Sequence, residues 1–201
     1  RYPLVIGVLL FRGDGDRLVR REVVLRRHRG PRRRAGCRRL DIALERDCPW
    51  GDDIPRGEVT GLDLKDGFDV TDPAAWGSVG RFDLACLNAG VTTGTAAIAE
   101  LSDEEYRRVV AVNVDGVLFG VRRLAGVMGD GDAIVVTSSL AGLTGVESDP
   151  IYALTKHAVI GLVRSVAPQL RDSGIRINAV CPGFADTPMV TSELRSAFET
   201  A

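Results

Sequence analysis

A tyrosine and a lysine four residues apart, Tyr152 and Lys156, indicate a chemical function more specifically than any other residues in this chain. On a helix, residues at this spacing project from the same face, with Cβ atoms roughly 5–6 Å apart. An ammonium beside a phenol favours the phenolate and lowers the pKa of the phenol from its ordinary value of about 10. Such a tyrosine could exchange a proton while an alcohol and a carbonyl are interconverted. Most pairs at this spacing are ordinary helix surface, so the surrounding segments decide how much the motif means.

Three short apolar runs, each followed by a polar or glycine-containing segment, surround this pair in the sequence. The runs are residues 82–87, 133–137 and 175–181, and they are followed by Asn88-Ala89-Gly90, Ser138-Ser139 and Pro182-Gly183. Apolar, β-branched runs of this length are typical of parallel strands buried on both faces. Because helical stretches separate them, the sequence predicts an α/β fold: a Rossmann-like doubly wound parallel sheet in a single domain. Ligands on such sheets bind at the carboxyl ends of the strands.

From about Val59 to Thr187 the chain resembles a short-chain dehydrogenase/reductase. The matching segments are Asn88-Ala89-Gly90, Asn113 between two valines, Ser139, Tyr152 with Lys156, and Pro182 to Thr187. Residues 138–143 and 173–184 are most similar to the 15-hydroxyprostaglandin dehydrogenase-like branch of that family. The resemblance covers roughly two thirds of the chain.

The resemblance implies an NAD(P)-dependent oxidoreductase that transfers a hydride between NAD(H) and a secondary alcohol or ketone. Tyr152 would be the catalytic acid/base, and Lys156 would lower its pKa and hold the nicotinamide ribose. Ser139 would hydrogen-bond the substrate oxygen, and Asn113 would anchor a water relay to Lys156. Two hydroxyl donors directed at an alkoxide-like oxygen would stabilise its charge in the transition state.

Each of these residues also has a structural interpretation. Ser139 could cap the following turn, and the family spacing makes Ser138 the better structural candidate of the two serines. Asn113 could bond to nearby backbone within a helix. The agreement of four residues in register favours the functional interpretation.

Residues 59–63 are predicted to form a strand that ends in Asp63, whose carboxylate would accept hydrogen bonds from the adenosine ribose. An acid at this position repels a 2′-phosphate, so NAD is expected as the cofactor in preference to NADP; a solvated aspartate without a role in cofactor binding is the alternative.

Asp69 and Val70 match the family's adenine-contacting position, although Thr71 or Asp72 could instead cap a helix that begins near Pro73. The other cofactor-binding positions that the resemblance implies are Asn88, Ala89, Gly90, Pro182, Gly183 and Thr187, in addition to Tyr152 and Lys156.

The family's glycine-rich phosphate loop is missing from the expected position, about 20 residues before the ribose-binding acid. Residues 38–45 occupy that position and contain no glycine. The nearest G-x-G, Gly13-Asp14-Gly15, carries acids that would repel a pyrophosphate, and we interpret it as a turn. Because backbone amides at a helix N-terminus bind the pyrophosphate, this departure predicts weakened cofactor binding.

The composition changes at the same place. Residues 1–60 contain 15 arginines, no lysine and nine acids, a net charge of +6, whereas residues 61–201 have a net charge of −7. We therefore divide the chain into an atypical arginine-rich segment, 1–57, and a Rossmann domain, 58–201. A reading-frame slip in a GC-rich gene would produce such a segment, and a divergent N-terminal segment is the alternative. Residues 4–11 could still form a strand.

The C-terminal part is also short by comparison with the family. The chain stops at Ala201, soon after Thr187, so the usual final strand is expected to be lacking and the chain to be truncated or partial. That strand commonly contributes to subunit contacts in the family, so a homo-oligomer is a weakened expectation.

Other classes of function have less support. No segment approaches the ~20 apolar residues that cross a bilayer, and the four cysteines show no C-x-x-C spacing, so we expect a cytoplasmic protein without a metal or membrane partner. A zinc site from His28, Cys37 and Cys48 is a minor alternative. The main competing function is a catalytically weak or silent binding or scaffold protein, because the phosphate loop is absent. Nucleic-acid binding through residues 26–39 is the least favoured.

Overall fold

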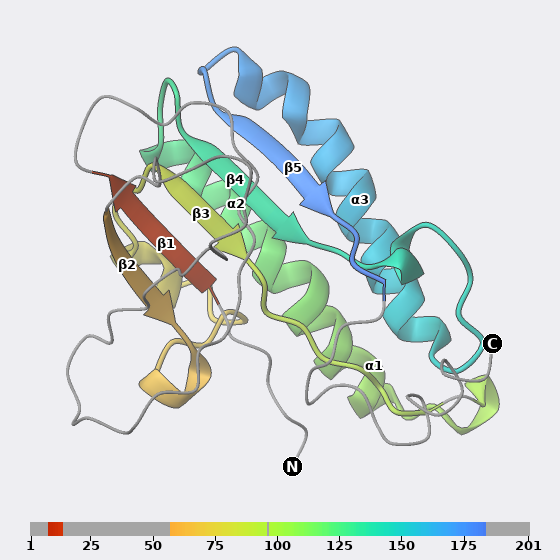
Figure 1. The fold of residues 1–201 in the computed structure, drawn as a ribbon. Helices are drawn as coiled ribbons and strands as arrows, with labels where there is room; N and C mark the ends of the chain where they lie inside the picture. Colours follow the sequence, from red (N-terminus) through yellow and green to blue (C-terminus); the bar gives the residue numbers. More distant parts are fainter. Residues whose placement is uncertain (1–7, 14–56, 96, 184–201) are drawn as a thin grey trace, which may run out of the picture.

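The computed structural model describes residues 8–13, 57–95 and 97–183, which form a sheet with helices packed on it (Figure 1). The strands are β1 (Val8–Gly13), β2 (Gly57–Leu62), β3 (Leu84–Leu87), β4 (Ala133–Thr137) and β5 (Arg176–Val180). The helices are α1 (Asp103–Val110), α2 (Gly116–Val127) and α3 (Pro150–Arg171), and a π-helical turn, Ala111–Asp115, joins α1 to α2. Shorter 3-10 turns lie at Leu64–Asp66, Ala75–Ser78, Ile98–Glu100 and Leu140–Gly142.

The strands β3, β4 and β5 are parallel neighbours, as the apolar runs predict. Leu84 pairs with Ala133, and Ala133 pairs with Arg176, so the three strands begin in register. Their side chains alternate between two buried clusters. Ala85, Leu87, Ile134 and Val136 belong to the large core that includes residues of α2 and α3, and Leu84, Cys86 and Ala133 form a smaller cluster. The α/β, Rossmann-like fold class is therefore confirmed.

The strand β1 differs from the all-parallel sheet that the sequence predicts. It lies between β2 and β3 in the order β2-β1-β3-β4-β5 and pairs antiparallel with both. The physical reason for the error is that a strand buries the same side chains in either direction, so its apolar pattern does not specify its polarity. The strand β2 still runs in the direction of β3, because Leu62 and Leu87 both pair with Val8.

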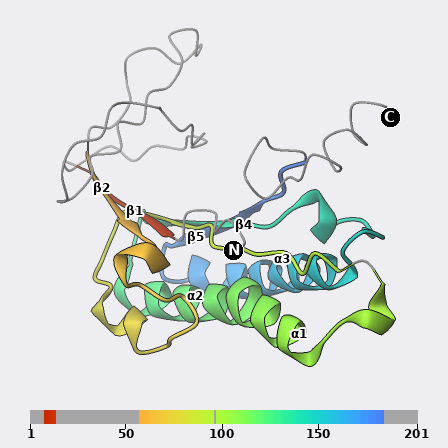
Figure 2. The ribbon, with the colours of Figure 1, turned by 90° about the horizontal axis from the view of Figure 1, so that it is seen from below.

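The described helices lie together on one face of the sheet (Figure 2). The first, α1, begins at a capping box: Ser102 Oγ accepts from the Glu105 backbone, and the Glu105 carboxylate accepts from the Ser102 backbone. The long helix α3 begins at Asp149, whose side chain accepts a hydrogen bond from the Tyr152 N–H. The helix that was expected to begin near Pro73 is only the 3-10 turn Ala75–Ser78, and Gly77 within it lowers helix propensity.

Candidate active site

Four segments with candidate functional residues meet at one edge of the sheet, where β2, β3, β4 and β5 end. The pairing register brings Leu62 and Leu87 to the two sides of Val8, and it pairs Leu87 with Val136 and Thr137 with Val180. The segments that follow these strands contain the residues predicted as candidates: Asp63, Asn88-Ala89-Gly90, Ser139 and Pro182-Gly183. The backbone joins two of them directly, since the Leu140 N–H donates to the Pro182 carbonyl oxygen at 2.8 Å.

Tyr152 lies in the first turn of α3 and is partly buried. Burial raises the pKa of its phenol above the ordinary value of 10.0; a hydrogen bond with the Ser139 hydroxyl lowers it, and the negative charge of Asp149 raises it. Ser139 also caps the turn that follows it, because its Oγ accepts from the Ala141 N–H at 3.2 Å. The structure thus brings the two predicted hydroxyl groups together, and the capping role of Ser139 accompanies this contact.

Lys156 is almost fully buried, with 3% of its surface exposed. Its Nζ donates to the Thr137 carbonyl oxygen at 2.9 Å and lies 5.5 Å from the centroid of the Tyr152 ring. Burial lowers the pKa of the ammonium to about 8, because transfer from water penalises the charged form. The helix and the end of β4 therefore hold an ammonium whose proton is more easily lost than that of an exposed lysine.

The direction of the pKa shift on Tyr152 is opposite to the one that the Tyr152/Lys156 spacing predicts. The ammonium lies over the ring and is bound to Thr137, and burial of the phenol outweighs the effect of its neighbours. A helical spacing of four fixes which face two side chains share, but it does not fix where their polar ends are held or how much water reaches them.

The buried lysine makes stability depend on pH in a way that a single substitution can isolate. The folded-state pKa of about 8 lies below the ordinary lysine value of 10.5, so the unfolded chain binds more protons between these values. Stability therefore rises with pH across this window. Lys156→Met removes the titrating group and should therefore remove this rise. Urea unfolding of both proteins from pH 7 to 10.5 measures the difference. Equal pH dependence in the two proteins would contradict the prediction.

Asn113 lies in the π-helical turn and is fully buried. Its Nδ2 donates to the Val91 carbonyl oxygen at 2.8 Å and to Thr155 Oγ1 at 3.0 Å, and its Oδ1 accepts from the Val91 N–H at 2.8 Å. The side chain therefore joins the segment after β3 to α3 and bonds beyond its own helix. Gly90 lies at the same junction, because a Cβ there would be 3.4 Å from Lys156 Nζ and 3.6 Å from Asn113 Oδ1.

The two serines after β4 have different environments. Ser138 is buried and its Oγ donates to the Lys156 carbonyl oxygen at 3.0 Å, which supports the structural interpretation of this residue. The approach of α3 to this turn also requires Gly142, where a Cβ would lie 2.7 Å from both the Lys156 carbonyl oxygen and Ser138 Oγ. Ser139 is only partly buried and makes the contact with Tyr152.

At the end of β2, Asp63 is 6% exposed, and Lys65 binds it through both its backbone N–H and its ammonium, the latter at 2.7 Å.

The residues at the predicted adenine position also have local structural roles: Asp69 Oδ1 accepts from the backbone and the hydroxyl of Thr71. Val70 is buried against Gly116, where a Cβ would come within 2.9 Å of its side chain. The carboxylate of Asp72 accepts from the Ala74 N–H, as expected of a cap.

Several sequence-based predictions concern residues outside the described ranges: Thr187, residues 38–45, the arginine-rich run and the zinc alternative. The direction of β1 decides where Gly13, the first glycine of the G-x-G segment, lies in the sheet. Because it runs opposite to β3, Gly13 lies beside Gly57 at the far end of the sheet from Asp63 and Asn88. Gly13 itself therefore lies at the opposite end of the sheet from the residues predicted to bind the cofactor.

Three buried polar residues of the site, Thr93, Asp149 and Thr155, were not among the residues predicted from the sequence. Thr93 and Thr155 are fully buried and Asp149 is buried. Thr155 Oγ1 accepts from Asn113 and donates to the Tyr152 carbonyl oxygen at 2.7 Å. A Thr three residues after the tyrosine was visible in the sequence, but its partner 42 residues away was not.

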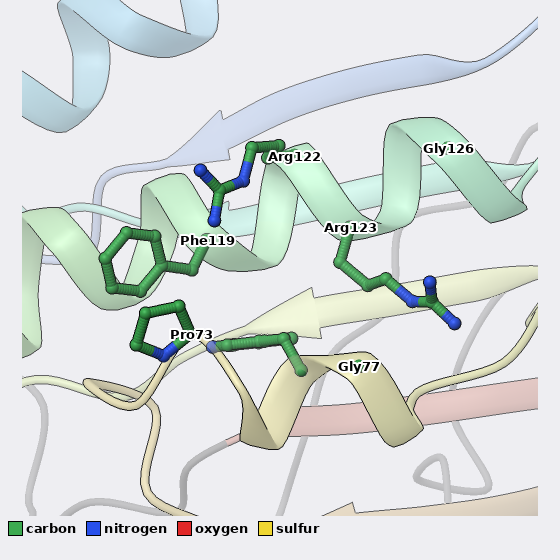
Figure 3. Close-up of a pocket in the computed structure, with 7 residues that line it drawn as sticks. Pro73, Gly77, Phe119, Arg122, Arg123 and Gly126 are labelled. Atoms are coloured by element: carbon green, nitrogen blue, oxygen red, sulfur yellow. The ribbon is translucent and has the colours of Figure 1, made fainter.

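A surface pocket with a volume of about 270 Å³ lies away from this site, between the Ala75–Ser78 turn and α2 (Figure 3). Its lining includes Pro73, Phe119, Arg122 and Arg123. The Arg123 Nε donates to the Val79 carbonyl oxygen at 2.7 Å, and Arg122 lies over the Phe119 ring. None of the candidate catalytic residues lines this pocket.

The described residues offer neither a metal site nor a membrane-spanning helix. Within residues 8–13, 57–95 and 97–183, no three His, Cys, Asp or Glu side chains are grouped so that they could hold a metal ion. In the same part of the chain, no helix has both the length and the hydropathy needed to cross a bilayer.

Comparison with known families identifies the class of protein. A family model described as enoyl-(acyl carrier protein) reductase matches residues 61–200. The chain belongs to the short-chain dehydrogenase/reductase family, as its motifs predict. The match begins just before Asp63 and includes every candidate catalytic residue.

Individual relatives differ in their named substrates. The chain is 34% identical over 143 residues to 3β-hydroxysteroid dehydrogenase 2 of Eggerthella lenta, covering 69% of this chain and 54% of the relative. It is 40% identical over 113 residues to cyclohexanol dehydrogenase of Acinetobacter, covering 55% and 45%. A solved structure of ElxO with NADP bound matches with a TM-score of 0.54 and 30% identity, over 66% of this chain and 56% of that chain. The chain thus spans about half the length of the curated relatives it matches.

Proposed function

We propose that this chain forms the catalytic part of an oxidoreductase that interconverts a secondary alcohol and a ketone with a nicotinamide dinucleotide. The observation that supports this most strongly is the hydrogen bond between Tyr152 and Ser139 at the end of β4, with the Lys156 ammonium over the tyrosine ring. A phenol and an alcohol hydroxyl placed together can both bond one substrate oxygen. In a member of this family, that arrangement favours chemistry at a carbonyl or carbinol group.

The residues at this edge fit a nicotinamide dinucleotide. A buried carboxylate, Asp63, lies at the end of β2, and the ammonium of Lys156 lies beside Gly90 at the end of β3. Asp63 would hold the adenosine ribose and Lys156 the nicotinamide ribose, while the backbone of Asn88-Ala89-Gly90 and Pro182-Gly183 would line the cofactor between them. Asp69 and Val70 would flank the adenine, and Thr187 would contact the nicotinamide carboxamide. The cofactor, when bound, supplies or accepts the hydride.

Tyr152 would act as the acid/base. In the direction of reduction its phenol donates a proton to the carbonyl oxygen; in the direction of oxidation its phenolate takes the proton from the hydroxyl. Ser139 would donate a second hydrogen bond to the same oxygen and stabilise the charge that develops on it. Lys156 would exchange protons with Tyr152, in either direction, through a water held near Asn113. The side chain of Asn113 is already fixed by hydrogen bonds with Val91 and Thr155.

An apolar, ring-containing secondary alcohol is the proposed class of substrate. Leu140 and Leu143, one and four residues after Ser139, have 48% and 52% of their surfaces exposed. Exposed apolar side chains beside a site favour an apolar ligand. The relatives are named for a hydroxysteroid and for cyclohexanol. Oxidation of cyclohexanol, followed by the absorbance of the reduced cofactor, tests the proposal directly, and absence of turnover with either dinucleotide would overturn it.

Binding of the cofactor can be tested separately from turnover. Calorimetric titration with NADH should give a saturable heat, weaker than is usual because the strand direction of β1 moves Gly13 away from the pyrophosphate position. Lack of heat up to millimolar NADH would favour the catalytically silent alternative.

We also propose a reducing cytoplasm as the location of the protein, since the described cysteines, Cys86 and Cys181, are both free thiols.

We propose NAD as the preferred cofactor on the basis of Asp63. Asp63→Ala should relax the discrimination between the two dinucleotides and raise the kcat/KM for NADP relative to NAD about tenfold, because a carboxylate that repels the 2′-phosphate is removed. Lys65→Ala is the matched control: it removes the ammonium 2.7 Å from the carboxylate and should strengthen the preference for NAD. An unchanged NAD/NADP ratio in Asp63→Ala would refute the role of this residue.

A further inference from the structure

Asp149 makes more hydrogen bonds than capping α3 requires. One carboxylate oxygen, Oδ1, accepts from the Tyr152 N–H at 2.9 Å and from Thr93 Oγ1 at 2.8 Å. The other oxygen, Oδ2, accepts from the Thr93 N–H at 2.9 Å. The carboxylate is buried, as is Thr93, which lies 56 residues earlier in the chain.

The segment that Asp149 contacts is the continuation of the edge described above. Asn113 holds Val91, the Arg108 guanidinium donates to the Thr92 carbonyl oxygen at 2.7 Å, and Asp149 holds Thr93. Helices α1 and α3 and the π-helical turn therefore fix three consecutive residues just after Gly90. Only one of these anchors, Asp149, also bonds to the backbone of Tyr152.

We propose that Asp149 is a positioning residue for Tyr152: it locks the first turn of α3 to the segment after β3 and places a buried negative charge that acts on the phenol. This inference rests on the proposed function of Tyr152 as the acid/base. A carboxylate near a phenol disfavours the phenolate, so Asp149 raises the pKa of Tyr152 in addition to the larger effect of burial. Its role is thus both geometric and electrostatic.

Three polar groups lie around Tyr152, and two of them, Ser139 and Asp149, shift the pKa of its phenol. Ser139 comes from the turn after β4 and bonds the hydroxyl; Lys156 comes from the next turn of α3, with Nζ 5.5 Å from the ring centroid; Asp149 comes from the N-cap. Among these, Asp149 alone carries negative charge. Its removal should move the titration of Tyr152 to lower pH, because the phenolate no longer faces a like charge.

The test uses Asp149→Asn, which removes the charge and keeps an oxygen that can accept from the Tyr152 N–H. The acid limb of kcat/KM for alcohol oxidation should move to lower pH, since oxidation needs the phenolate. In Asp149→Ala the bonds to Thr93 are lost as well, and kcat should fall roughly 10- to 100-fold as Tyr152 loses its fixed position. Thr93→Val removes the hydroxyl that donates to Asp149 but keeps the negative charge of Asp149. The acid limb of its kcat/KM profile should therefore stay close to that of the wild type.

A helix cap elsewhere provides the control for stability. Ser102→Ala removes the cap of α1, at a cost of about 1 kcal/mol, and should leave the pH profile unchanged. An Asp149→Asn profile that coincides with the wild-type profile would overturn the electrostatic role. An Asp149→Ala variant with wild-type kcat would overturn the geometric one.

A direct titration separates this inference from the proposed function. The chain has three tyrosines, so ¹³Cζ-tyrosine NMR can follow each ring, and Tyr152→Phe assigns the signal. The Tyr152 midpoint should fall in Asp149→Asn whether or not the chain turns over an alcohol. If the wild type shows no nicotinamide-linked turnover and the midpoint still falls, the proposed function fails while the effect of Asp149 on Tyr152 stands. An unmoved midpoint refutes that effect.

Discussion

Tyr152→Phe is expected to lower kcat for the nicotinamide-linked reaction by about 10²- to 10⁴-fold, the usual contribution of a positioned acid/base. The substitution removes one oxygen, and with it both the exchangeable proton and the hydrogen bond to Ser139. The ring remains, so the contact with Lys156 Nζ at 5.5 Å can persist. Stopped-flow or steady-state turnover, with circular dichroism to verify folding, measures the effect.

Two comparisons make this result specific. Tyr106→Phe changes an exposed tyrosine on α1, 42% exposed, and should leave kcat within about twofold, as expected of a surface substitution that removes one solvated hydroxyl. Cofactor affinity of Tyr152→Phe should change far less than kcat, since a group used mainly in the transition state affects turnover more than binding. Unchanged activity in Tyr152→Phe would overturn the catalytic assignment.

The second large effect is expected on stability, at Asn113. Asn113→Leu keeps a similar volume but leaves the buried N–H and C=O of Val91 without their partner, and Thr155 loses a donor. Each buried group left unsatisfied costs about 1–3 kcal/mol, so the free energy of unfolding should fall by about 2–5 kcal/mol. Urea unfolding monitored by circular dichroism measures this loss.

Thr155→Val is the graded comparison for Asn113. It removes one of the bonds made by Asn113 and the bond to the Tyr152 carbonyl oxygen, and it should cost about 1 kcal/mol. The ordering of the two variants is the sharper test. If Asn113→Leu destabilises no more than Thr155→Val, the three-bond junction does not hold the segment after β3 to the helices.

The hydrogen bonds of Asn113 show that a structural role and a catalytic role of this residue do not exclude each other. The sequence analysis weighed a water relay against local backbone bonding. The structure shows a third arrangement, in which the amide of Asn113 binds both Val91, 22 residues earlier, and Thr155, 42 residues later. Its location beside Gly90 and Lys156 still places it next to the proposed proton path, so the role in a relay remains a proposal.

The parts of the fold that are encoded locally could be predicted from the sequence. The apolar run at residues 133–137 is β4, and the runs at 82–87 and 175–181 contain β3 and β5. The candidate site followed from the same logic, because strand ends in a parallel sheet share one edge. The family motifs then named Tyr152, Lys156 and Ser139, which the structure brings together.

Tertiary structure alone decided the direction of β1, the rise in the pKa of Tyr152 and the bonds of Asp149 to Thr93. Each depends on what lies across space. The alternation of side chains is identical in both strand directions, burial depends on which segments cover a phenol, and a carboxylate cannot show in its own sequence that its partner lies 56 residues away. Local patterns specify elements and their ends, whereas polarity, dielectric environment and long-range hydrogen bonds arise only when those elements pack.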